Sequence, residues 1–112
     1  MDVSHDQAHS RFVVSIDGHT AELQYEALSD GVLDLIHTGV PKELQGRGVG
    51  DALALAAFEY ARSNGHRVIL TCPFLRRWIV SHPEQRDIVI WKGRGAGGGG
   101  VGGGGGGDSG PR

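Results

Sequence analysis

Three glycines on alternate positions, Gly46, Gly48 and Gly50, directly precede an alanine- and leucine-rich segment that is typical of a helix. Residues without side chains let backbone N–H groups approach a ligand closely, and the N–H groups of the first helical turn have no partner within the helix. An anion such as a pyrophosphate is the ligand that this arrangement favours. Arg47 can add a local positive charge. A flexible loop that merely leads into the helix is the alternative.

Two common nucleotide-binding motifs do not fit this segment. A P-loop ends in Gly-Lys-Ser/Thr, whereas Gly50 is followed by Asp51 and Ala52. The dinucleotide fingerprint G-x-G-x-x-G needs a third glycine, and its two possible frames meet Asp51 or Leu53 there. The sequence therefore predicts an anion site made by backbone amides at a helix start, without either motif.

The segment before the glycines predicts an antiparallel meander. Residues 11–16 are rich in β-branched side chains, Asp17-Gly18 is a turn signal, and residues 20–28 alternate between apolar and polar. These two strands form a hairpin. After a second turn, residues 32–40 read as a third antiparallel strand.

The segment after the glycines changes period. Apolar residues recur at helical spacing from about residue 48 to 63, and Asn64-Gly65 is suited to a helix C-cap. Residues 66–72 form a short apolar run, so a strand, helix and parallel strand follow one another. A second helix is expected over 74–82 and a closing strand over 87–91. The predicted fold class is α+β, with a mixed central sheet.

Composition sets the domain limits and excludes several functions. We expect a flexible N-terminus over residues 1–10, one domain over 11–92 and a disordered glycine-rich tail over 93–112. The formal charge of −2 gives no general attraction to nucleic acid or to a membrane surface. No apolar run is long enough to span a bilayer. We therefore expect a soluble, cytoplasmic monomer.

Metal and disulfide sites are not indicated. A single cysteine, Cys72, cannot form an internal disulfide. Four histidines have no metal-ligand spacing to a cysteine or a carboxylate pair. They are His5, His9, His19 and His66.

The segment QGRGVG matches the Q/R-x-x-G-x-G/A signature of the GNAT superfamily of N-acetyltransferases. Together with HTGVP, CPF and HPE in the same order, it resembles the small, minimal GNAT-like N-acetyltransferase domains, over residues 12–90. The resemblance implies an acetyl-CoA site and a sheet that splays open at the cofactor. The pantetheine arm would lie between the strand ending near Val40 and the strand ending at Cys72, paired with the backbone of Val40. The amides that would hold the pyrophosphate are those of Gln45, Gly46, Arg47, Gly48, Val49 and Gly50.

Acetyl transfer to an amine requires a base, an oxyanion site and an acid for the leaving thiolate. His37 is the preferred base, because histidine exchanges protons near neutral pH; a histidine merely hydrogen-bonded at a strand end is the alternative. Amides near Gly39 and Val40 are candidates for the oxyanion site. Cys72 can accept the acetyl group, protonate the thiolate, or serve only as a small buried hydrophobe.

The second helix departs from the pattern of larger superfamily members, which generally use a tyrosine there as general acid. This chain offers Phe74 and Trp78 instead. We expect Phe74 at the cofactor and Trp78 as a packing residue that lines the cleft. Arg76 and Arg77 can bind a CoA phosphate or an acidic substrate, or form a solvated helix face; Arg77 is the one we assign to the cofactor.

Three functions compete. The leading interpretation is an acetyl-CoA-dependent N-acetyltransferase acting on an amine, in a protein or a small molecule. The second is a CoA- or acyl-CoA-binding module with little turnover, since the minimal fold lacks the N-terminal helices that build an acceptor pocket in larger relatives. The third is an interaction module that displays the glycine-rich tail.

Overall fold

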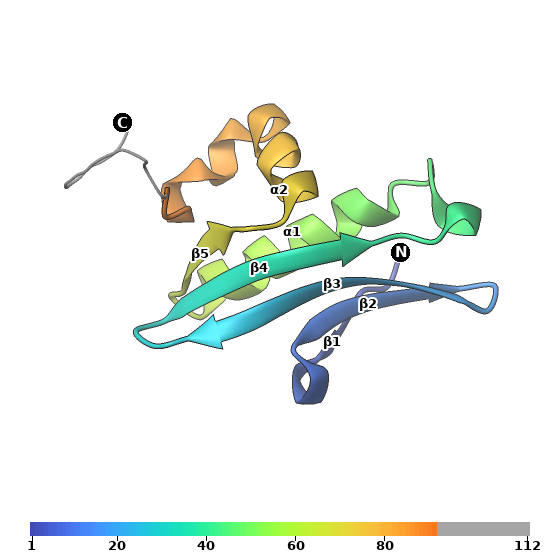
Figure 1. Ribbon diagram of the computed structural model, residues 1–112, viewed down its shortest axis with the longest axis horizontal. Helices are drawn as coiled ribbons and strands as arrows, with labels where there is room; N and C mark the ends of the chain where they lie inside the picture. The colour runs from blue at the N-terminus through green and yellow to red at the C-terminus, as the bar shows by residue number, and fades with distance from the viewer. Residues whose placement is uncertain (92–112) are drawn as a thin grey trace.

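The computed structural model describes residues 1–91, which form a five-stranded sheet with a long helix against one face (Figure 1). The strands are β1 (Ser4–Asp6), β2 (Arg11–Ile16), β3 (His19–Leu28), β4 (Val32–Gly39) and β5 (Arg67–Leu70), in the spatial order β1-β2-β3-β4-β5. The helices are α1 (Val49–Ser63) and α2 (Pro73–Trp78), with short 3-10 helices η1 (Gln7–His9), η2 (Lys42–Leu44), η3 (Ile79–Ser81) and η4 (Pro83–Ile88). Within residues 1–91, no helix is long and apolar enough to cross a membrane.

The predicted meander is confirmed. Strands β2, β3 and β4 pair antiparallel in chain order. The turn between β2 and β3 has positive φ at both central residues, Asp17 (53°) and Gly18 (78°). Asp and Gly tolerate that conformation, which matches the twist of the flanking strands. The sequence signal for this hairpin was therefore specific.

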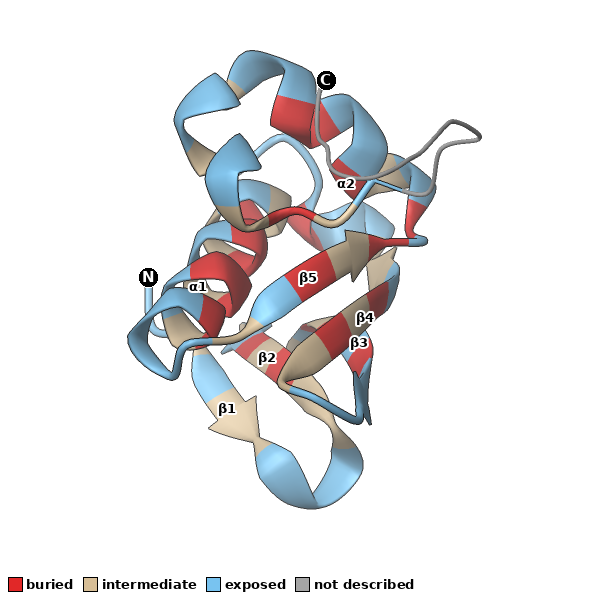
Figure 2. Cartoon of the chain, turned by 90° about the vertical axis from the view of Figure 1, so that its left-hand side faces the viewer, coloured by how far each residue is buried: buried red, intermediate tan, exposed pale blue. Residues whose placement is uncertain are grey.

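The predicted crossover is confirmed as well, because β5 pairs parallel to β4 after α1. The C-terminus of α1 is closed by Gly65, whose φ is +70°. Helix α1 buries one side against the sheet, and Figure 2 shows the buried positions on the facing surfaces of α1 and the strands. Fully buried members of this core are Leu23 and Leu35 from the sheet and Leu53, Ala54, Ala57, Phe58 and Ala61 from α1. This packing fixes the start of α1 near one end of β4.

The N-terminal segment differs from the expectation that residues 1–10 are flexible. Ser4–Asp6 forms β1 and pairs antiparallel with β2. His5 anchors it: its ring stacks on Phe12 with centroids 4.2 Å apart, and its Nε2 lies 2.7 Å from the hydroxyl of Tyr25. The sequence does not predict this strand because it depends on these distant aromatic contacts and not on a local pattern.

The C-terminal segment also differs. The helix expected over 74–82 is divided into α2 and η3. The strand expected over 87–91 is reduced to one parallel bridge, Val68 to Val89, because η4 extends through Ile88 and leaves three described residues. The prediction of a disordered tail at 93–112 lies outside the described residues.

Candidate active site

Strands β4 and β5 separate near the middle of β4. Their ladder ends where Leu35 pairs with Leu70, and the carbonyl of Leu35 then accepts bonds from the amides of Thr71 (3.1 Å) and Cys72 (2.9 Å). Strand β4 continues to Gly39, so residues 36–39 extend beyond the last β5 partner (Figure 1). The backbone edge of this extension can pair with an extended ligand, because a strand edge presents N–H and C=O groups.

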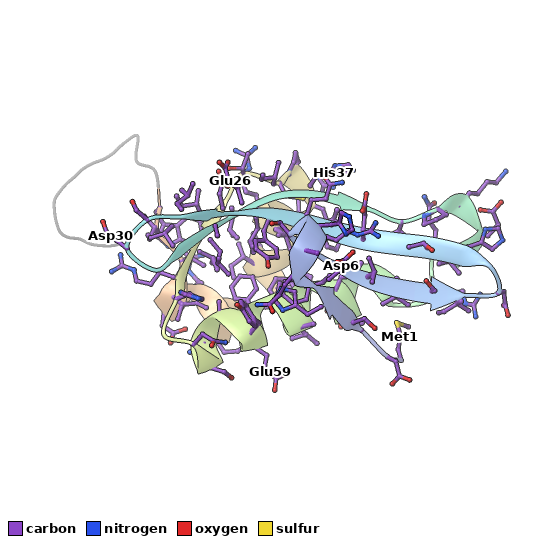
Figure 3. All side chains as sticks on the ribbon, turned by 90° about the horizontal axis from the view of Figure 1, so that it is seen from below. Met1, Asp6, Glu26, Asp30, His37 and Glu59 are labelled. Carbon is purple, nitrogen blue, oxygen red and sulfur yellow. The ribbon has the colours of Figure 1, made fainter. Side chains whose placement is uncertain are left out.

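A β-bulge lies at the point of separation. Tyr25 pairs with Leu35 and Gln24 pairs with His37, which leaves Ile36 as the extra residue. The bulge reverses which side each later residue faces. His37 therefore lies opposite the exposed Gln24, on the sheet face away from α1. Figure 3 shows His37 and Glu26 on this same side of the sheet.

His37 and Cys72, the two predicted catalytic residues, lie on opposite faces of the sheet. Cys72 is 2% exposed and its Sγ lies 3.4 Å from Thr38 Oγ1, whose residue pairs with the buried Leu23. His37 is exposed and its ring lies over Gly39, where an added Cβ would come within 3.3 Å of Nε2. The structure thus brings Cys72 to Thr38 and not to His37.

The glycine loop, residues 45–50, connects the end of β4 to α1. Gly46 and Gly48 have φ values of +76° and +78°, and a Cβ on either would meet no atom within 4 Å. The helix has a glycine N-cap without a side-chain hydrogen bond, and the first amide of α1 bonded back to Gly48 is that of Ala52 (3.0 Å). The amides of Val49, Gly50 and Asp51 therefore have no helical partner at the positive end of α1, whereas the amide of Gln45 donates to the carbonyl of Lys42 at 3.2 Å.

Val40 and Gln45 contact each other across the two ends of this connection. The side-chain Nε2 of Gln45 donates to the carbonyl of Val40 at 3.2 Å. Both residues are assigned to the cofactor from the sequence. The bond ties the extension of β4 to the glycine loop, so the strand edge and the helix N-terminus lie together.

Gly50 brings α1 and α2 into close contact. A Cβ at Gly50 would lie 2.9 Å from Cζ of Phe74, well inside a normal carbon contact. Phe74, another predicted cofactor residue, thus packs against the first turn of α1. Gly50 serves helix packing at this position.

The arginines differ in their surroundings. Arg47 Nη1 lies 3.9 Å from Asp17 Oδ2 at the β2–β3 turn, with about half of its side chain exposed (48%). Arg76 Nη2 donates to the carbonyl of Thr71 at 3.2 Å. Arg77 is exposed on α2. Arg47 is thus the predicted cation that lies within the glycine loop.

A family model described as GCN5-related N-acetyl-transferase matches residues 11–88. The chain belongs to this family. The protein NATD1 of Gallus gallus is 32% identical over 83 residues, covering 72% of this chain and 76% of that protein. NATD1 of Homo sapiens is also 32% identical, and the match covers 74% of that protein. The NMR solution structure of a GCN5-like protein from Staphylococcus aureus superimposes with a TM-score of 0.64 at 27% identity, over 80% of this chain and 87% of that one.

Membership in the GCN5-related family confirms the resemblance stated from the motifs, and the superposition confirms the α+β fold with a mixed sheet. The matched residues include the glycine loop, Cys72 and His37. Within residues 1–91, no group of three or more His, Cys, Asp or Glu side chains is arranged to hold a metal ion.

Trp78 packs as expected but also makes a polar contact that sequence reasoning missed. Its side chain is buried, 7% exposed, and its Nε1 donates to Asp51 Oδ1 at 2.8 Å. The ring of His82 stacks on it at 3.9 Å. The sequence identifies Asp51 only as a mismatch to the P-loop and to the dinucleotide fingerprint, and it gives no signal for Thr38. Neither contact is signalled by local spacing, because each joins residues at least 27 positions apart.

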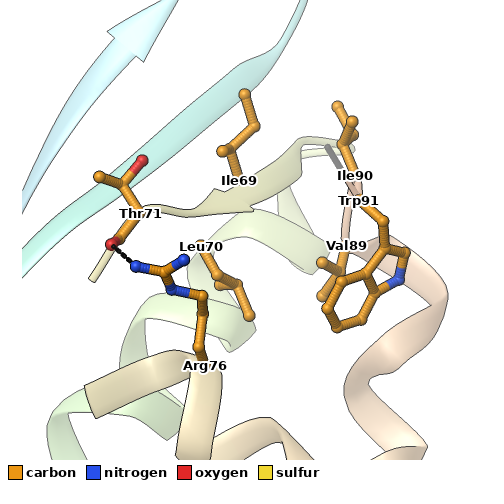
Figure 4. Close-up of a pocket in the computed structure, with 7 residues that line it drawn as sticks. All are labelled: Ile69, Leu70, Thr71, Arg76, Val89, Ile90 and Trp91. Carbon is orange, nitrogen blue, oxygen red and sulfur yellow. Dashed lines mark hydrogen bonds between the residues drawn. The ribbon is translucent and has the colours of Figure 1, made fainter. Parts of the chain in front are cut away.

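A separate cavity of about 230 Å³ lies on the far side of β5 from β4. Its walls come from β5, α2 and the segment after η4, with Arg76 and Trp91 at its sides (Figure 4). Drug-sized ligand sites usually measure about 300–1,000 Å³. This cavity is smaller, and Arg76 is the one residue lining it that the sequence indicates as a candidate phosphate ligand.

Proposed function

We propose that the protein is an acetyl-CoA-dependent N-acetyltransferase that transfers an acetyl group to an amine. The observation that carries the proposal is the shared location of two features. The extension of β4 beyond Leu35, whose edge toward β5 has no strand partner among the described residues, lies together with the glycine loop at the start of α1. The bond from Gln45 to Val40 joins them. One would pair with the pantetheine arm, and the other would bind the diphosphate.

The diphosphate fits the glycine loop for a physical reason. Gly46 and Gly48 leave open space where side chains would stand, and the amides of the first α1 turn have no helical partner. Arg47 adds a cation that is only loosely engaged by Asp17 at 3.9 Å. Phe74 and Arg77 on α2 complete the proposed cofactor surface.

The transfer step places the two faces of the sheet in different roles. The amine nitrogen attacks the thioester carbonyl, a C–N bond forms, the C–S bond breaks, and the nitrogen loses a proton. We assign that proton to His37 on the outer face and the protonation of the CoA thiolate to Cys72 on the inner face. Amides near Gly39 and Val40 would bind the oxyanion. Acetylation of Cys72 itself is the competing assignment.

A pair of glycine variants tests cofactor binding. Gly48→Ala and Gly65→Ala each place a side chain on a residue with similar positive φ (+78° and +70°) and open surroundings. Each should lose about 1–2 kcal/mol of stability from backbone strain. Only Gly48→Ala should weaken acetyl-CoA binding measured by calorimetry. Equal affinity in both variants would contradict the proposed diphosphate site.

Turnover is tested by thiol release from acetyl-CoA in the presence of a panel of amines. We expect release to depend on the amine and to fall at least about tenfold in His37→Ala and in Cys72→Ala. His9→Ala, an exposed histidine with 73% of its side chain accessible, is the matched control. Binding without amine-dependent release would favour the alternative, a CoA- or acyl-CoA-binding module.

A further inference from the structure

Asp51 occupies the position in α1 from which an acidic side chain ordinarily caps a helix. Gly48 is the N-cap, so Asp51 is the third helical residue. A side chain there commonly reaches back to the N-cap amide, and the positive end of the helix favours its negative charge. Asp51 instead accepts a hydrogen bond from Trp78 Nε1 at 2.8 Å.

Several contacts hold Trp78 where it can make this bond. Its ring lies against Phe58 with centroids 5.2 Å apart, and the ring of His82 stacks on it at an interplanar angle of 12°. His82 Nδ1 lies 2.8 Å from the carbonyl of Trp78, and its Nε2 lies 3.4 Å from Asp51 Oδ1. The indole is therefore fixed, whereas the Asp51 side chain is half exposed (50%) and receives its 2.8 Å hydrogen bond from the indole N–H.

We propose that Trp78 is a positioning residue that draws the Asp51 carboxylate away from the start of α1 and so keeps the helix amides free for a diphosphate. This rests on the proposed function. A released carboxylate would act in two ways. It would occupy amides that the diphosphate needs, and it would repel a ligand of the same charge.

Trp78→Phe tests the proposal, because it retains an aromatic ring against His82 and Phe58 but removes the N–H donor. We expect the Kd for acetyl-CoA, measured by calorimetry, to rise about three- to tenfold. Asp51→Asn alone should bind at least as tightly as the wild-type protein. The double variant Trp78→Phe with Asp51→Asn should recover that affinity, since no carboxylate is then present to compete.

His82→Ala provides a second route to the same release, because it removes the stacking that holds the indole. The affinity of His82→Ala for acetyl-CoA should fall by less than that of Trp78→Phe. Adding Asp51→Asn should restore it in the same way. If the wild-type protein fails to bind acetyl-CoA, the proposed function and this inference both fail. If the wild type binds and Trp78→Phe binds equally well, this inference alone fails. A loss that Asp51→Asn does not restore would show a packing effect and would equally overturn it.

Discussion

The close contact between Gly50 and Phe74 predicts that Gly50→Ala changes the free energy of unfolding. The sign of that change depends on which side chain stands at position 74. A Cβ on Gly50 would lie 2.9 Å from Cζ of Phe74, against a normal carbon separation of about 3.5 Å. The ring must therefore retreat by roughly 0.6 Å. Overpacking of this kind costs about 1–3 kcal/mol, while alanine gains about 1 kcal/mol over glycine within a helix. Gly50→Ala should thus lower the free energy of unfolding by about 0 to 2 kcal/mol.

In the Phe74→Leu background the same substitution should become stabilising, by up to about 1 kcal/mol, because leucine lacks the ring atom that clashes. Urea denaturation of the wild type, both single variants and the double variant measures this as a coupling energy. Identical effects of Gly50→Ala in the two backgrounds, within about 0.3 kcal/mol, would refute the close approach of α1 and α2.

Two further predictions concern pH. Burial lowers the pKa of His5 below its ordinary value of 6.5, with the nearby Asp6 acting in the opposite direction. The stability that His5 contributes is therefore fully present above 6.5 and is lost as pH falls below that value through the lowered pKa. The protection of the β1 amides against hydrogen–deuterium exchange, relative to the intrinsic exchange rate at each pH, should fall below about pH 6.5, and less so in His5→Phe. The bond from Arg62 lowers the pKa of Asp87, so its contribution is present above the ordinary aspartate value and is lost in acid as pH falls through the lowered one. Arg62 donates from α1 to both carboxylate oxygens of Asp87 in η4, which precedes Trp91. Near-UV signals of Trp91 should therefore change at low pH in the wild type, and already near neutral pH in Arg62→Ala; an unchanged Trp91 signal in that variant would contradict this link between α1 and η4.

The sequence predicted best those elements whose signals are local. The Asp17-Gly18 turn, the helical period of α1 and the Gly65 cap each involve neighbouring residues, and all three are in place. The parallel crossover followed from the order and length of its parts. Failures arose where distant contacts decide. Ser4–Asp6 has no apolar alternation and becomes a strand because His5 inserts among Phe12, Tyr25 and Tyr60.

The position of the glycine loop at the start of α1 could be predicted from the sequence. Which side chains of the candidate site contact each other could not. Strict alternation along β4 places His37 on the same face as Leu33 and Leu35, toward the core and Cys72. The bulge at Ile36 shifts that register by one residue, so Thr38 faces the core instead. No residue in this stretch predicts the bulge, because the position of a bulge depends on how the strand pairs with its partner. The hypothesis that His37 and Cys72 converge depended on a register that the sequence alone does not determine.

The bulge also bears on how the proposed acceptor would reach a thioester bound at the edge of β4. A thioester held by the edge of β4 would lie between an inner side, with Cys72 and Thr38, and an outer side, with His37. The inner side is filled by the core, since Cys72 is 2% exposed and Leu35 is fully buried. In the proposed mechanism the amine would therefore approach from the outer face, where His37 lies exposed. On the proposed assignment, the one-residue shift at Ile36 would place the proton acceptor on the side from which the nucleophile approaches, and the thiol on the side where the leaving group is sheltered from water.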